Sequence, residues 1–169
     1  FTANNDPGNI STDDSLTNDP WYIGGSWIEG YRADRIDTLL SQAIAENRAD
    51  IEEMQIIQGD IKSSLGAAFG PVLVESIELA QALATTDGPL SDIEARILDL
   101  YLQDADRMDE ALIYLQAWRD ADYPALSGVE TFYHTPGENE ATMSVATTIH
   151  NAWMGRFQSM VFSDEGMPD

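Results

Sequence analysis

Residues 1–36 read FTANNDPGNISTDDSLTNDPWYIGGSWIEGYRADRI, and this stretch decides how the rest of the chain is interpreted. It is rich in Asn, Asp, Gly and Trp, and it leads directly into a strongly periodic segment. We expect a short strand end at residues 1–3, then a loop, then a helix that begins at about Arg32. An amide and a guanidinium brought together by a strand end and a helix start can stabilise negative charge developing on an oxygen. The same residue types also suit an ordinary turn, and the pattern alone leaves both interpretations open.

From Arg32 onwards, apolar residues recur with the 3.6-residue period of amphipathic helices. The pattern therefore predicts a mainly helical chain of about six helices after a short β and loop start. The first expected helix runs from Arg32 to about residue 48, and the second begins at about Asp50, with Ile61 and Leu65 facing inward. After a break at residues 66–71, a third helix runs from Val72 to Leu83, and a fourth begins at a capping box formed by Ser91 and Glu94. The last two run from residues 104–106 to about Trp118 and from about Glu140 to Val161.

Four segments carry a family resemblance: TANN at residues 2–5, NDPWYIGG at 18–25, GYRADRI at 30–36 and ADIEEMQIIQGD at 49–60. Together they resemble the penicillin acylase family of N-terminal-nucleophile amide hydrolases. In that family an "ANN" segment ends a core strand, a "YRA-x-RI" segment opens the helix after the next loop, and an "iQ-x-D" helix follows.

The resemblance implies that this chain is an internal piece of the family's large (β) chain. The complete enzyme would have the αββα sandwich of an α+β N-terminal-nucleophile hydrolase and would be made by autocatalytic cleavage of a precursor. Residues 1–31 would then be a strand end and an active-site loop, and residues 32–169 a helical region of the same domain. The partners implied are the small chain and the rest of the large chain of the same precursor.

The resemblance also assigns catalytic roles. Asn4 would donate its side-chain N–H to the oxyanion of the tetrahedral intermediate, and Arg32 would orient the nucleophile and amide cluster or steer the acyl substrate. The nucleophile would be a Ser, Thr or Cys upstream, because Phe1 has no nucleophilic atom. The substrate would be a small N-acyl compound such as a β-lactam or an acyl-homoserine lactone.

Two further groups of residues in the loop are candidate binding residues. Aromatic side chains between glycines suit a wall of an acyl pocket, and they equally suit a loop anchored in the core. Carboxylates in the acidic loop could hold a structural calcium ion, as in some family members, or could simply be solvated; no cofactor is required for the chemistry. The pocket candidates are Trp21, Tyr22, Trp27 and Tyr31, and the calcium candidates are Asp13, Asp14 and Asp19.

The charge excludes some classes of partner. Thirty acidic residues against eight basic ones give a net charge of −22, which opposes binding to nucleic acid or to an anionic membrane surface. No apolar run approaches the length of a membrane span, and the chain has no cysteine for disulfides or thiolate metal sites. The resemblance implies a periplasmic or secreted location.

A second class of function also fits the composition. A non-catalytic, acidic, salt-adapted helical module for binding or assembly would explain the charge and the helices without any homology. It would not explain why several family segments recur in order at compatible spacing.

The acidic, lysine-poor composition leads to a prediction about salt. Lys62 is the only lysine in the chain, and an excess of carboxylates destabilises the folded state by self-repulsion unless salt screens it. Thermal unfolding should therefore show a melting temperature that rises steeply with added NaCl. A melting temperature that stays level would mean that the acidic residues are merely a solvated surface.

Overall fold

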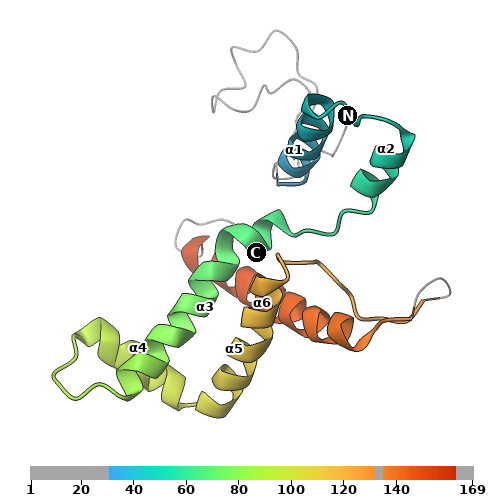
Figure 1. Cartoon of the computed structure of the whole chain (residues 1–169). Helices are drawn as coiled ribbons and strands as arrows, with labels where there is room; N and C mark the ends of the chain where they lie inside the picture. The colour runs from blue at the N-terminus through green and yellow to red at the C-terminus, as the bar shows by residue number, and fades with distance from the viewer. Residues whose placement is uncertain (1–30, 132–134, 163–169) are drawn as a thin grey trace, which may run out of the picture. The chain divides into compact units, whose positions relative to one another are not determined.

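The structure, a computed structural model, describes residues 31–131 and 135–162 (Figure 1). These ranges contain six α-helices and no strand, although Lys62 and Pro124 form an isolated antiparallel bridge. The expectation of a mainly helical chain is confirmed for the described residues, while the expected strand end at residues 1–3 lies outside them. The chain divides into two compact units, residues 1–60 and residues 61–169. The predicted division after residue 31 stays a prediction.

The first unit contains helices α1 (Tyr31–Ala45) and α2 (Ile51–Gln58). Asn47 ends α1 in a left-handed conformation (φ 55°), which Asn tolerates better than most residues. The N–H of Arg48 donates to the carbonyl of Ala43 (2.8 Å), which closes the helix end in the manner of a Schellman motif. A side-chain cap then starts α2 after a short turn, so the helix boundary near residue 48 was predictable from the sequence.

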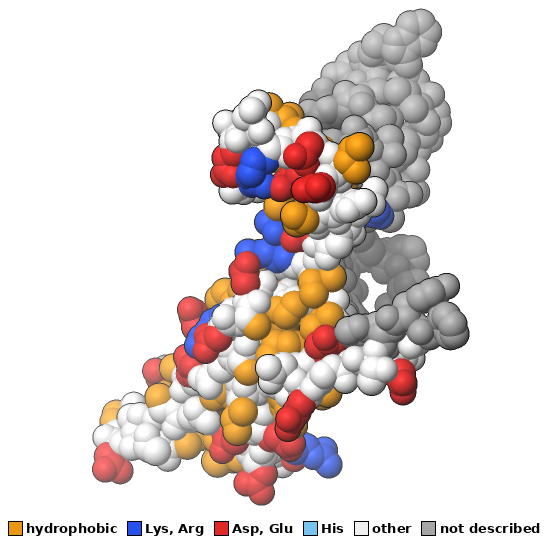
Figure 2. All heavy atoms as spheres, turned by 45° about the vertical axis from the view of Figure 1, so that its right-hand side comes forward, with side chains coloured by type: hydrophobic (Ala, Val, Ile, Leu, Met, Phe, Trp, Pro, Cys, Tyr) orange, Lys and Arg blue, Asp and Glu red, His pale blue; other side chains and the backbone are white. Residues whose placement is uncertain are grey.

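The prediction that the second helix continues through Ile61 and Leu65 is wrong. Helix α2 ends at Gln58, where the backbone N–H of Gly59 bonds back to the last turn, and Leu65 belongs to the next helix. Apolar spacing alone could not show where the helix ends, because part of the face that we expected to point inward is exposed. Figure 2 shows apolar side chains at the surface among acidic ones. The exposed side chains that we expected to face inward in this unit and just after it are Ile44 (67 %), Ile51 (78 %) and Ile61 (48 %).

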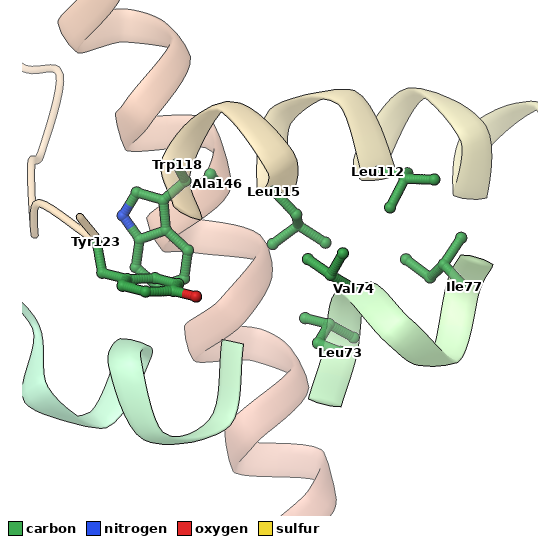
Figure 3. Packing of buried hydrophobic residues seen from close by; sticks show 8 residues of the cluster. All are labelled: Leu73, Val74, Ile77, Leu112, Leu115, Trp118, Tyr123 and Ala146. Carbon is green, nitrogen blue, oxygen red and sulfur yellow. The ribbon is translucent and has the colours of Figure 1, made fainter. Parts of the chain in front are cut away.

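The second unit contains helices α3 (Ser64–Ala84), α4 (Asp92–Leu102), α5 (Ala105–Asp120) and α6 (Glu138–Phe162). Helices α3, α5 and α6 pack on one another, and α4 packs on α3 and α5. Figure 3 shows aliphatic side chains of α3 meeting those of α5, with two aromatic rings at the end of α5. The buried core cluster consists of Leu73, Val74 and Ile77 of α3, Leu112, Leu115 and Trp118 of α5, Tyr123, and Ala146 of α6.

Helix α4 is held by local and long-range hydrogen bonds. The predicted capping box is confirmed: the Ser91 hydroxyl accepts from the Glu94 N–H, and the Glu94 carboxylate accepts from the Ser91 N–H. At its other end, the Tyr101 hydroxyl (2.7 Å) and the Gln81 amide (2.8 Å) both donate to one carboxylate oxygen of Asp109. The hydrogen bond from Tyr101 and, to a smaller extent, the one from Gln81 lower the pKa of Asp109. The same bonds join α4 to α3 and α5.

The predicted helix break at residues 66–71 is also wrong. Helix α3 begins at Ser64, is capped by the Ser63 side chain, and runs through Gly66, Gly70 and Pro71. Two glycines and a proline inside a helix cost about 5 kcal/mol in intrinsic propensity. Burial of four large apolar side chains on α3 offsets this cost, because each contributes about 1.5–3 kcal/mol. These side chains are Leu73, Val74, Ile77 and Leu83.

The two glycines of α3 have a packing role. A Cβ at Gly66 would stand 2.5 Å from the Trp118 ring, and one at Gly70 would stand 2.6 Å from the Tyr123 ring. The aromatic rings therefore lie directly against the backbone of α3. This contact explains why a sequence that looks like a helix breaker is part of a helix.

Helix α3 is the one described helix that is long and apolar enough to cross a membrane by length and composition. A core helix of a globular protein passes the same test, and α3 supplies a large share of the buried core. The composition of α3 therefore gives no support for a membrane span.

The segment after α5 ties that helix to the start of α3. Asp122 and Tyr123 both have left-handed backbones (φ 65° and 60°). The Lys62 ammonium bonds both carboxylate oxygens of Asp122 (2.6 and 2.7 Å), and the N–H of Ser63, the cap of α3, donates to the Tyr123 carbonyl (2.8 Å). These bonds hold the unusual backbone against the start of α3.

The close approach at Gly66 gives a test of the packing. Gly66→Ala should destabilise the protein by about 1–3 kcal/mol, because the added methyl group collides with the Trp118 ring, although alanine is the better helix former. Urea unfolding followed by circular dichroism measures the change.

Gly155 of α6 is the matched control, because a Cβ there meets nothing within 4 Å. Gly155→Ala should stabilise the protein by about 0.5–1 kcal/mol. Equal effects of the two substitutions would contradict the close contact at Gly66.

Candidate active site

The structure describes two of the predicted site residues, Tyr31 and Arg32, which are the first two residues of α1. Both side chains are exposed, Tyr31 to 41 %. The other predicted site residues fall outside the described ranges and stay predictions: Asn4, Asp13, Asp14, Asp19, Trp21, Tyr22 and Trp27.

Arg32 occupies the positive end of a helix. The N-terminal end of an α-helix carries a partial positive charge, to which the guanidinium of Arg32 in the first turn of α1 adds. Asp34 in the same turn offsets part of this charge. A cation at this position costs the isolated helix a few tenths of a kcal/mol or more. The start of α1 is thus a place where negative charge would be stabilised.

Arg35, one turn further along α1, is bound to the far end of α2. Its guanidinium donates to both carboxylate oxygens of Asp60, from Nε (2.9 Å) and from Nη2 (2.7 Å). The two side chains are 26 % and 22 % exposed, so the pair is only partly shielded from water. A bidentate pair of this kind fixes orientation as well as distance. The two residues of the pair are 25 positions apart in the sequence.

The Arg35–Asp60 pair joins two of the segments that the sequence singled out, residues 30–36 and residues 49–60. Asp60 closes the second of these segments, and it was not among the predicted site residues. The one feature of the sequence that could have pointed to Asp60 is its position at the end of this segment. The pair therefore joins α1, which carries Tyr31 and Arg32, to the end of α2.

A second arginine secures the turn between α1 and α2. Arg48 donates to the carboxylate of Glu46 (2.7 Å) and also pairs with Glu53 in the first turn of α2. Hydrogen bonds from Gln42 and then from Arg48 lower the pKa of Glu46. The first unit is therefore held at both ends by arginine–carboxylate contacts, and Ala43 is the one buried side chain in its two helices.

No group of three or more metal-binding side chains occurs in the described ranges. The chain has two histidines, of which His134 lies outside these ranges and His150 is buried in α6. The calcium prediction concerns residues outside the described part and is not tested there.

Comparison with known proteins identifies one family. The family model described as penicillin amidase matches residues 1–167, which is nearly the whole chain. No curated protein and no solved structure matches. The resemblance predicted from the four N-terminal segments is confirmed by this match.

The Arg35–Asp60 pair gives a test of the geometry of the first unit. Asp60→Asn keeps the shape of the side chain and removes its charge, so the contact between the ends of α1 and α2 should weaken by about 1 kcal/mol, a value suited to a partly exposed pair. Amide hydrogen exchange in α1 and α2 should accelerate about fivefold.

The matched control is Asp37→Asn, which removes an exposed carboxylate from α1. It should leave the exchange rates of α2 unchanged. The same acceleration in both variants would show that the loss of any negative charge, and not this pair, controls the unit.

Proposed function

Because the chain belongs to the penicillin amidase family, we propose that it is part of an amidohydrolase that cleaves carboxylic amides of N-acyl compounds. β-Lactam side chains and acyl-homoserine lactones are the substrate types that fit this chemistry. The observation that carries the proposal is the family match over residues 1–167.

The reaction divides into two steps. The hydroxyl or thiol of an N-terminal Ser, Thr or Cys, contributed by a segment upstream of Phe1, attacks the amide carbonyl while the free α-amine takes its proton. The tetrahedral intermediate collapses, the C–N bond breaks and the amine leaves with a proton. Water then attacks the acyl-enzyme ester or thioester, and the carboxylic acid is released.

This chain would supply the groups that stabilise charge. Asn4 donates its side-chain N–H to the oxyanion in both steps. Arg32 adds positive charge at the start of α1 and orients the nucleophile and the amide cluster or steers the acyl substrate. Two features of the described residues support this role: the exposure of Arg32 at a helix N-terminus, and the bidentate contact that fixes α1 one turn away.

Tyr31 and the aromatic residues that precede α1 in the sequence would shape the acyl pocket. Tyr31 begins the helix next to Arg32 and is partly exposed, which suits a residue that contacts a ligand. Trp21, Tyr22 and Trp27 would form the rest of the wall.

The complete enzyme would have the αββα core of N-terminal-nucleophile hydrolases, with its remaining segments contributed by the same autocatalytically cleaved precursor. A structural calcium ion held by Asp13, Asp14 or Asp19 and a periplasmic or secreted location complete the proposal. The chemistry itself needs no cofactor.

The role of Asn4 is testable in the complete natural enzyme with a panel of N-acyl p-nitroanilides. Asn4→Ala should lower kcat on the order of 10²–10³-fold, because one oxyanion donor is lost. The melting temperature and the far-ultraviolet circular dichroism should not change.

Asn5→Ala is the matched control, since it removes the same amide from the neighbouring residue, which we assign to turn geometry. It should keep kcat within a few-fold of the wild-type value. Near-normal turnover of Asn4→Ala would refute the assignment of the oxyanion donor.

A further inference from the structure

Helix α6 presents one histidine in the middle of its buried face. Ala146, His150 and Met154 follow one another at intervals of four residues, and their exposures are 0 %, 1 % and 5 %. His150 is the one buried polar side chain among the described residues, and the residues four positions before and after it on this face of α6, Ala146 and Met154, are apolar.

The surroundings of His150 are aromatic. The imidazole centroid lies 5.1 Å from the ring of Trp118 on α5 and 6.0 Å from the ring of Trp153 on α6. Within the described part of the chain, no hydrogen bond of good geometry reaches either ring nitrogen. A neutral imidazole has one donor and one acceptor, so both are buried here at a cost that an apolar side chain would avoid.

Among the residues that the structure describes, no charged group compensates a positive charge on this imidazole. Burial lowers the pKa of His150, and only the adjacent Asn151 opposes that shift; no charged side chain of the helices packed around it contributes. Across the Trp118 ring stands Tyr123, a phenol whose pKa burial raises, so it stays neutral. On α3 the residues beside these two rings are Gly66 and Gly70.

We propose that His150 is an acid-sensitive switch that releases α6 from α5 and α3. In its neutral form the imidazole fills the space between Trp118 and Trp153. In its protonated form it has no anionic partner and must reach water, which requires α6 to move away from Trp118. Because α6 packs on both α3 and α5, its release would open the core of the second unit.

The sign of the pH dependence follows from linkage. The pKa of His150 in the folded state lies below the value of about 6.5 that histidine has in an unfolded chain. The stabilising effect of the neutral imidazole is therefore complete above about pH 6.5 and is lost as the pH falls towards the folded-state pKa. In that window the equilibrium constant for opening should rise up to tenfold for each pH unit.

The test is hydrogen exchange measured by mass spectrometry on the intact natural protein, at several values between about pH 7.5 and pH 5, corrected for the intrinsic exchange rate. In the wild type, the equilibrium constant for opening, measured on peptides from α6, should rise as the pH falls below about 6.5, by up to tenfold for each pH unit. His150→Met places an apolar side chain without a titratable group on the same face of α6. In this variant the opening of α6 should lose the part of its pH dependence that comes from the histidine.

His134→Gln is the matched control, because it removes the other histidine of the chain. It should keep the acid-induced opening of α6. Equal pH dependence of the wild type and His150→Met would overturn the proposal, since the carboxylates would then account for all of the effect.

A second measurement does not depend on how well the methionine variant folds. In wild-type protein labelled with ¹³C at the histidine rings, the His150 resonance should change only together with the opening of α6, and below the usual titration range of histidine. A His150 resonance that titrates near pH 6.5 while α6 stays protected would contradict the switch.

Discussion

The indole of Trp118 is the contact on which the second unit depends. Its ring is 1 % exposed, and it lies edge-on to Tyr123 and directly against the backbone of α3 at Gly66. Its Nε1–H donates to the Pro124 carbonyl (2.9 Å), which also accepts from the Thr147 hydroxyl of α6 (3.2 Å). One side chain thus connects α3, α5, α6 and the segment after α5. A glycine in α3 and a left-handed turn are features that this close packing requires.

In the described part of the first unit, charge pairs join the helices in place of a buried core. Its two helices bury a single side chain, Ala43, and are joined by the Arg35–Asp60 pair at one end and by Arg48 at the other. Charge pairs therefore position the start of α1, where Arg32 is exposed. Added salt has opposite effects on the two sources of stability, because it screens the repulsion within a chain of net charge −22 and also weakens partly exposed ion pairs.

Local signals in the sequence were reliable where local energetics decide the structure. The capping box at Ser91 and Glu94 fixed the start of α4, and the 3.6-residue period gave a mainly helical chain of six helices in the described ranges. The signals failed at residues 66–71, because contacts with distant aromatic rings outweigh the local cost of glycine and proline. The Arg35–Asp60 pair was equally unpredictable, since periodicity carries no information about which charges meet across 25 residues. For the candidate site, the sequence supplied the family and the residue roles, and the structure describes the helix start at which two of those residues lie.

We propose that this chain works as part of an amide hydrolase whose nucleophile is an N-terminal residue generated by cleavage. N-terminal sequencing and the intact mass of the mature protein from its natural source test this proposal. We predict two tightly associated chains, the larger of which begins with Ser, Thr or Cys and contains the residues described here. A stable single species of 18.6 kDa that begins at Phe1 would contradict it, because such a protein would have no nucleophile at its N-terminus.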